Sequence, residues 1–134
     1  MKTNSVRRII LVIFSVFTAS VLGISSAQAY SVAFSYDGYG IRDWPSLGAT
    51  YVSSGKTVKI VHNQTPDYEG NAWMAVHIEK QYWYGWKSVA SVSYKNDARG
   101  KVSYHKISAD GTYRLRFISD PTAYSFHVWG TFNK

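Results

Sequence analysis

The chain has 134 residues, an aromatic content of 16%, a formal net charge of +7 and no cysteine. The absence of cysteine excludes disulfides, thiolate metal sites and thiol catalysis. A chain of this length forms a single domain, whose core is large enough to fold without covalent braces.

Residues 1–29 have the pattern of a secretory signal. Three basic residues and no acid occupy the first eight positions, residues 9–24 carry no charge, and Ala27 and Ala29 complete a small-x-small cleavage site. The uncharged run is shorter than the roughly 20 residues that cross a bilayer, which favours a cleaved signal over a membrane anchor. We therefore expect a bacterial protein that is secreted or held on the cell wall. Its mature domain, residues 30–134, contains no further transmembrane segment.

The mature domain is mildly basic. Loss of the signal removes three of 15 basic residues and none of the eight acids, so the net charge falls to +4. The remaining positive residues are scattered and form no helical basic motif or RNA-binding signature, so nucleic acid is not an expected partner. A modest attraction to an anionic polymer is compatible with this charge.

Residues 30–134 show no sustained helical period, and short alternating runs rich in β-branched and aromatic residues dominate. A hairpin is expected around Ser54-Gly55, and loops are expected at residues 37–45 and 64–70. The pattern indicates an all-β fold, an antiparallel β-sandwich of about 7–8 strands, because no crossover helix is available for parallel strands. Strands are expected, in chain order, at 30–36, 47–53, 56–63, 72–80, 86–95, 101–107, 112–119 and 124–132.

Two of these runs alternate clearly enough to assign their faces. In 72–80, Met74, Val76 and Ile78 share one side, with Trp73, Ala75, His77 and Glu79 on the other. In 113–117, aromatic or aliphatic residues alternate with arginines. We expect an inward face of Tyr113, Leu115 and Phe117 and an outward face of Arg114 and Arg116.

Residues 76–117 also contain a set of turn and strand-end residues, namely Gly85, Trp86, Val89, Ala90, Gly100, Gly111, Tyr113, Arg114 and Arg116. This set resembles the second half of cysteine-free bacterial immunoglobulin-like modules. The resemblance implies a sandwich in which the Tyr113 hydroxyl bonds to upstream backbone, and in which Trp86 and Trp129 pack between the sheets. Leu115 stands where such modules often have cysteine. The resemblance implies a fold and no particular activity.

Catalytic and metal-binding motifs are absent from the sequence. The four histidines lie in separate predicted strands, without the spacing of a zinc motif, and we expect them at the surface or half-buried. Asp67 and Glu69 leave a calcium site open. No nucleophile elbow and no obvious carboxylate pair is visible, so we expect no enzyme activity and no cofactor.

Aromatic residues are the most informative feature. The mature domain has 11 Tyr, 5 Trp and 4 Phe, more rings than a small core needs. If Trp86 points inward, its register turns Tyr82 and Tyr84 inward and exposes Trp83; a bulge at Gly85 would instead free the two tyrosines. A second group, Tyr36, Tyr39 and Trp44, surrounds the expected loop at 37–45. The predicted ligand-binding residues are the rings Trp83, Tyr82, Tyr84 and Trp44, with Lys80 and Lys87 as donors.

These observations favour a secreted, non-enzymatic binding protein. Exposed rings on a rigid scaffold stack on sugar faces, so the expected ligand is carbohydrate or a cell-envelope polymer. Small size, positive charge and interfacial aromatic residues also fit an antimicrobial or toxin-like protein that acts at membranes. An inhibitor of an extracellular hydrolase is a further alternative, which the sequence does not rank.

Overall fold

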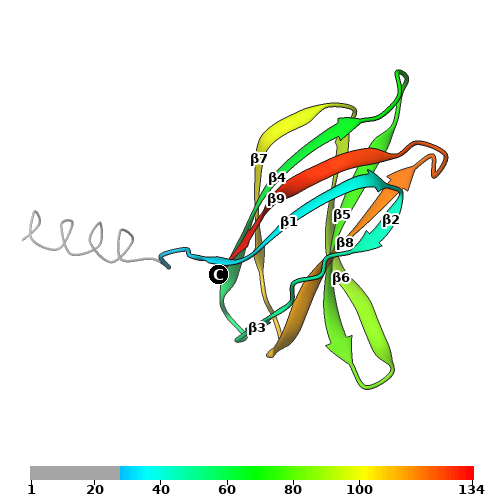
Figure 1. Ribbon diagram of the computed structural model, residues 1–134. Helices are drawn as coiled ribbons and strands as arrows, with labels where there is room; N and C mark the ends of the chain where they lie inside the picture. Colours follow the sequence, from blue (N-terminus) through cyan, green and yellow to red (C-terminus); the bar gives the residue numbers. More distant parts are fainter. Residues whose placement is uncertain (1–27) are drawn as a thin grey trace, which may run out of the picture.

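The computed structural model describes residues 28–134, so residues 1–27 of the predicted signal lie outside the described part (Figure 1). The described chain is an all-β sandwich, as predicted. It contains no helix long and apolar enough to cross a membrane. Its strands are β1 (Val32–Ile41), β2 (Asp43–Pro45), β3 (Thr50–Val52), β4 (Thr57–Pro66), β5 (Trp73–Tyr82), β6 (Gly85–Lys95), β7 (Ala98–Lys106), β8 (Gly111–Asp120) and β9 (Phe126–Asn133).

These strands form two antiparallel sheets. The first sheet has the order β1-β9-β4-β7, and the second has the order β2-β8-β5-β6. The short strand β3 also pairs with β8, next to β2 along the same edge. Consecutive strands often belong to different sheets, so most pairings join segments that are far apart in sequence.

The core lies between the sheets and follows the predicted alternation. Met74, Val76 and Ile78 of β5 are completely buried, and Leu115 and Phe117 of β8 are equally inaccessible. Burial of each such side chain contributes about 1.5–3 kcal/mol of hydrophobic free energy. The two alternating runs therefore supply much of the second sheet's contribution to the core.

The segment 37–45, predicted as a flexible loop, is mostly strand. β1 continues to Ile41 beside β9, and after Arg42 the chain enters β2 beside β8. An irregularity in the β1–β9 register lies between Gly38 and Ile41, and Gly40 within it has a φ of 65°. The glycines that suggested a loop thus serve a bulge, which bends the chain from one sheet to the other.

The predicted hairpin around Ser54-Gly55 is also wrong. β3 pairs with Gly111–Tyr113 of the second sheet, whereas β4 pairs with β7 and β9 of the first. The turn itself is present, because the Lys56 amide donates to the Ser53 carbonyl at 3.2 Å. A turn signal shows that the chain reverses, but it does not show that the flanking strands pair with each other.

The hydrogen bond that the immunoglobulin-like resemblance implied is present. The Tyr113 hydroxyl donates to the Ala109 carbonyl at 2.5 Å and closes the corner between β7 and β8. Trp86 and Trp129, however, do not pack between the sheets. Both are half-buried on outer faces, where their partners are the guanidinium groups of Arg114 and Arg99.

A chain of polar side chains crosses the core of the first sheet. Tyr36, Gly130 and His62 lie side by side on β1, β9 and β4. Because Gly130 has no side chain, the Tyr36 ring crosses it, and the Tyr36 hydroxyl lies 2.8 Å from Nδ1 of His62. Nε2 of His62 lies 2.9 Å from Oε1 of Gln64.

The Gln64 amide fixes the proton positions in this chain. Its Nε2 donates to the carbonyls of Tyr94 and Asn96, so its Oε1 is the acceptor for His62. His62 therefore carries its proton on Nε2 and accepts the Tyr36 proton at Nδ1. Burial lowers the pKa of His62 to about 4, so the ring is neutral at pH 7. The prediction of a surface or half-buried histidine is wrong at this position.

Candidate functional site

The β5–β6 hairpin carries most of the predicted ligand-binding residues. Tyr82 and Gly85 pair across it, and Trp83 and Tyr84 form a two-residue turn between them. Gly85 has a φ of 127°, a conformation that a residue with a side chain rarely adopts. The hairpin extends past the end of the sandwich (Figure 1). It therefore presents its turn residues to solvent.

The side chains of this hairpin stack on one another in a fixed order. The Lys80 ammonium lies 4.3 Å from the centre of the Tyr82 ring, and the Tyr84 ring stacks on Tyr82 at 5.3 Å. Trp83 meets Tyr84 edge to face at the same distance and is 95% exposed. Lys80 and Tyr84 thus cover the Tyr82 ring, so Trp83 is the ring with the largest free surface.

Two lysines face each other at the base of the hairpin. Lys80 of β5 is the direct partner of Lys87 on β6. Like charges at opposed positions of an antiparallel pair destabilise it by roughly 0.2–1 kcal/mol. The contact of Lys80 with Tyr82 offsets part of this cost through a cation–π interaction. A bound anionic group would remove the remaining repulsion.

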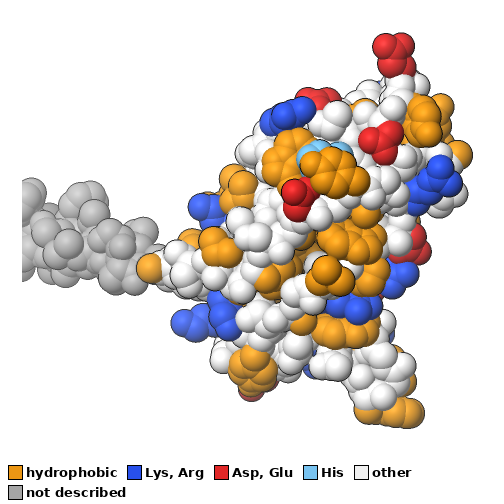
Figure 2. All heavy atoms as spheres, in the orientation of Figure 1, with side chains coloured by type: hydrophobic (Ala, Val, Ile, Leu, Met, Phe, Trp, Pro, Cys, Tyr) orange, Lys and Arg blue, Asp and Glu red, His pale blue; other side chains and the backbone are white. Residues whose placement is uncertain are grey.

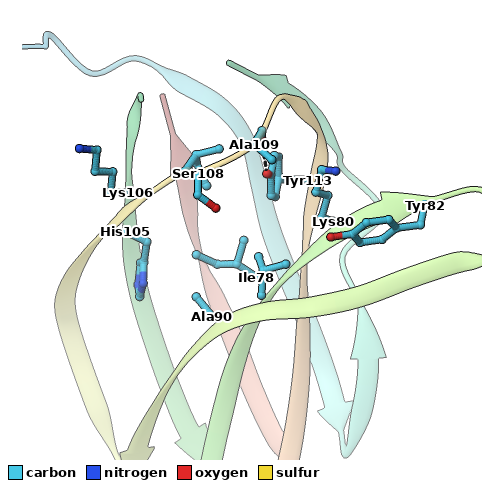
Figure 3. Close-up of a pocket in the computed structure, with 11 residues that line it drawn as sticks. Ile78, Lys80, Tyr82, Ala90, His105, Lys106, Ser108, Ala109 and Tyr113 are labelled. Atoms are coloured by element: carbon cyan, nitrogen blue, oxygen red, sulfur yellow. Dashed lines mark hydrogen bonds between the residues drawn. The ribbon is translucent and has the colours of Figure 1, made fainter. Parts of the chain in front are cut away.

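A small cavity lies between the hairpin base and the β7–β8 loop (Figure 3). It has a volume of about 80 Å³, and its lining includes Ile78, Ala90, Tyr82 and Ser108. Figure 3 shows the hydroxyls of Tyr82 and Ser108 directed toward the space beside Ile78 and Ala90. His105 lines the same cavity, and burial lowers the pKa of this imidazole.

Charge is unevenly distributed along the sandwich. We call the end with the β3–β4 turn, the β5–β6 hairpin and the β7–β8 loop the hairpin end. Asp110 lies there with its carboxylate bonded to the Ser54 amide. At the opposite end, acids occupy the β4–β5 and β6–β7 connections and the last position of β8, and most acidic side chains visible in Figure 2 lie toward that end. The lysines of the hairpin end are Lys56, Lys80, Lys87, Lys106 and Lys134.

Trp44 does not join this site. It pairs with Phe117, which in turn pairs with Val76 of β5. Val76 lies seven residues before Trp83 in the chain, which corresponds to roughly 23 Å at the rise of a strand. The Trp44 ring stacks on Phe117 at 5.7 Å and packs against the core. The two indoles therefore do not form one platform, because Trp44 is partly buried against the core far from Trp83.

A second surface cluster, which the sequence did not reveal, lies on the outer face of the first sheet. We call Tyr39, His127, Trp129 and Arg99 the outer stack. His127 stacks on Tyr39 at 3.9 Å and on Trp129 at 4.3 Å, and Arg99 lies 4.9 Å from the Trp129 ring. Figure 2 shows a histidine between hydrophobic side chains above the ends of β1 and β9. Asp37 accepts a hydrogen bond from His127 at 2.7 Å.

Alternation along 124–132 places His127 and Trp129 on one face, which is the one signal the sequence offered for the outer stack. The pairing of β1 with β9 brings Tyr39 to that face across about 90 residues of chain. Most ring faces in the stack are covered by neighbours, and Tyr39, at its end, is 75% exposed. The packing explains the stack as a cross-strand stabilising cluster.

The outer face of the second sheet holds a buried ion pair. Glu79 is only 6% exposed, and its carboxylate accepts a hydrogen bond from Arg114 at 2.9 Å. The Arg114 guanidinium also lies 4.2 Å from the Trp86 ring. The Trp86 indole therefore serves the ion pair, so it is not a free ligand-binding ring.

Histidines and acids do not converge in the described part of the chain. Within residues 28–134, no group of three such side chains could hold a metal ion. Asp67, half of the calcium hypothesis, accepts a hydrogen bond from the Ser125 hydroxyl at 2.5 Å. Glu69 lies exposed two residues further along the β4–β5 loop.

A larger hollow of about 310 Å³ lies near the C-terminus, lined by Tyr51, Lys56 and Lys134 among others. Gln28 and Ala29 also line it, and the Gln28 amide bonds to both backbone groups of Thr57. Cleavage after Ala29 would remove these two residues. The shape of this hollow therefore depends on processing of the predicted signal.

No family model and no curated protein matches this chain. Among solved structures, a chain of the Glycosylation Associate Protein (Gap123) complex from Streptococcus agalactiae is similar, with 5% sequence identity and a TM-score of 0.43. The similarity covers 81% of this chain and 22% of that chain. The chain thus corresponds to about a fifth of that protein, and a likeness at this level says nothing about function.

Proposed function

We propose that this is a secreted, non-enzymatic binding protein, which recognises an anionic carbohydrate polymer of a cell envelope with its hairpin end. The observation that carries the proposal is the position of Trp83. This indole is 95% exposed at the tip of a hairpin whose base holds the opposed pair Lys80 and Lys87. An exposed indole and two lysines that form no ion pair within the described residues favour a ligand that has both apolar faces and negative charge.

Each part of the site has a physical role in this proposal. The indole of Trp83 offers a flat apolar face with a polar N–H, which suits the face of a pyranose ring. Tyr82 and Tyr84 hold the turn in a fixed conformation through their stacking, so less side-chain entropy is lost on binding. The lysines of the hairpin end raise the local concentration of an anionic polymer.

The absence of catalysis is also part of the proposal. Two contacts join a serine hydroxyl to a histidine: Ser88 with Nδ1 of His77 at 2.9 Å, and Ser103 with Nε2 of His105 at 3.0 Å. His105 lines the smaller cavity, but neither serine lines either of the two cavities described above. This placement favours binding over chemistry, because a nucleophile needs a site that holds its substrate.

Retention on purified bacterial cell walls tests the proposal. Trp83→Ala should weaken retention by about tenfold or more, as expected for an anchor residue. Trp73→Ala is the matched control, since Trp73 is 46% exposed on the second sheet near the opposite end. The double variant Lys80→Gln, Lys87→Gln should bind more weakly, and its retention should depend less on salt than that of wild type. Equal retention of Trp83→Ala and wild type would refute the proposal.

Action at membranes is the second candidate, because a protruding indole above lysines also suits an anionic bilayer interface. Dye leakage from vesicles of anionic phospholipid separates the two functions. The wall-binding proposal predicts no leakage and no co-sedimentation with the vesicles. Leakage that Trp83→Ala abolishes would establish the membrane function instead.

A further inference from the structure

The cavity beneath the hairpin points to a specific part of the ligand. We infer that it takes the N-acetyl group of an amino sugar in the polymer, an inference that rests on the proposed function. The cavity lies between the base of the β5–β6 hairpin and the β7–β8 loop (Figure 3). Tyr82 lines the cavity and also stacks on Tyr84 in the hairpin.

The size of the cavity selects a small group. A cavity of about 150 Å³ holds benzene, which has six heavy atoms. At about 80 Å³, this cavity has room for about half as many. An acetyl group has a methyl carbon, a carbonyl carbon and an oxygen, and so fits this volume. A whole pyranose ring does not, so the sugar itself would stay at the mouth.

The lining matches an acetyl group in polarity as well. Ile78 and Tyr113 are almost completely buried and, with Ala90, give an apolar surface that suits a methyl group. A carboxylate or phosphate placed against this surface would lose hydration there, and its cationic neighbours in the lining would be Lys80 and Lys106. We therefore place the charges of the polymer at these lysines and the methyl group against the apolar surface.

Two hydroxyls at the edge of the cavity complete the match. The hydroxyls of Tyr82 and Ser108 point toward the cavity space (Figure 3). Hydrogen bonds in this region use the Ser108 carbonyl and the Tyr113 hydroxyl, which leaves the other two hydroxyls without partners among residues 28–134. They can bond the carbonyl oxygen and the N–H of an acetamido group, each of which needs one partner.

The position of the cavity also fits a polymer that reaches Trp83. From Lys80, at the cavity edge, to Trp83 is three residues, or roughly 10 Å of strand. A sugar with its acetamido group in the cavity would therefore leave a neighbouring unit within reach of the indole. The cavity would select the sugar, and Trp83 would supply affinity.

Two neutral probes with the same linkage isolate this inference from charge. One is the β-1,4-linked tetrasaccharide of N-acetylglucosamine, and the other is the corresponding tetrasaccharide of glucose, which has hydroxyls in place of acetamido groups. Titration followed by Trp fluorescence should give about tenfold tighter binding of the acetylated probe, from one buried methyl group and one hydrogen bond.

Variants of the cavity lining test whether the preference for the acetylated probe arises in this cavity. Ala90→Leu fills the cavity and should reduce the ratio of the two affinities to about one. Ala75→Leu, the same change on the outer face of the second sheet, should leave the ratio unchanged. Ser108→Ala, at an exposed position that tolerates the change, should lower the ratio by severalfold and so guards against misfolding of Ala90→Leu.

The outcomes separate this inference from the proposed function. Equal affinity for the two probes, or a preference that Ala90→Leu and Ser108→Ala leave intact, would overturn the acetyl site. If neither probe binds while cell walls still retain the protein through Trp83, the acetyl site is again overturned and the proposed function stands. Failure of both probes and of wall retention would overturn both.

Discussion

Acidification should destabilise this protein mainly through one buried histidine, His62. His62 has a pKa of about 4 in the folded chain, against an ordinary value of 6.5 that applies once the chain unfolds. Between these values the unfolded state binds a proton that the folded state does not. The contribution of His62 to the free energy of unfolding is therefore fully present above pH 6.5. Below pH 6.5 the free energy of unfolding falls by about 1.4 kcal/mol per pH unit.

The total loss follows from the same two pKa values. At pH 4 the unfolded state is almost fully protonated at His62, whereas half of the folded molecules are, which gives a loss of about 3 kcal/mol relative to pH 7. This is a large fraction of the 5–15 kcal/mol typical of a domain. Protonation would also place a charge between Tyr36 and Gln64, where no acid among residues 28–134 pairs with it.

Urea unfolding at pH 7 and pH 4, followed by tryptophan fluorescence, measures this loss. Carboxylates also titrate in the interval, so the comparison needs a variant that lacks the imidazole. His62→Gln keeps a donor and an acceptor on the side chain, and its loss between the two pH values should be about 3 kcal/mol smaller than that of wild type. Equal losses in the two proteins would refute the reasoning.

Three substitutions test the packing that supports the site, each by the change in urea unfolding free energy at pH 7. Gly130→Ala would place a Cβ 2.0 Å from the Val61 carbonyl oxygen and should cost about 3 kcal/mol or more. Arg114→Met leaves the buried Glu79 carboxylate unpaired and should cost about 3 kcal/mol, whereas adding Glu79→Met should restore most of the loss. Tyr113→Phe should cost about 1 kcal/mol, and no measurable change would contradict its role at the β7–β8 corner.

The sequence predicted the parts of this fold that depend on local alternation. Residues 72–80 and 112–119 show a clear period of two, and the structure buries the predicted faces. The Tyr113 hydrogen bond is also local, because it joins residues four positions apart. Lys80, Tyr82, Tyr84 and Lys87 lie near Trp83 because all five belong to the β5–β6 hairpin.

The errors concern pairings between distant segments. Nothing near Thr50 indicates that β3 pairs with β8 and not with β4. The face of Trp86 depends on a register shift between β5 and β6 next to Glu79, which moves the indole to the outer side. A single unpaired residue in a strand reverses every later side chain, so periodicity alone does not fix such a face.

The glycines and the proline around Trp44 predict a flexible loop, which favours a place for its indole in the ligand site. In the folded chain its neighbour is Phe117, a contact that only tertiary structure reveals. The outer stack was missed for the same reason, since Tyr39 meets His127 only through the β1–β9 pairing.

The most direct test of the account is to locate the binding surface in the amide NMR spectrum of the protein, with soluble fragments of digested cell wall as the ligand. We predict that the amides of residues 80–87 and 107–113 shift together and saturate with one affinity. Shifts confined to the outer stack around Tyr39 and Trp129, or no shift in either hairpin-end segment, would contradict the account.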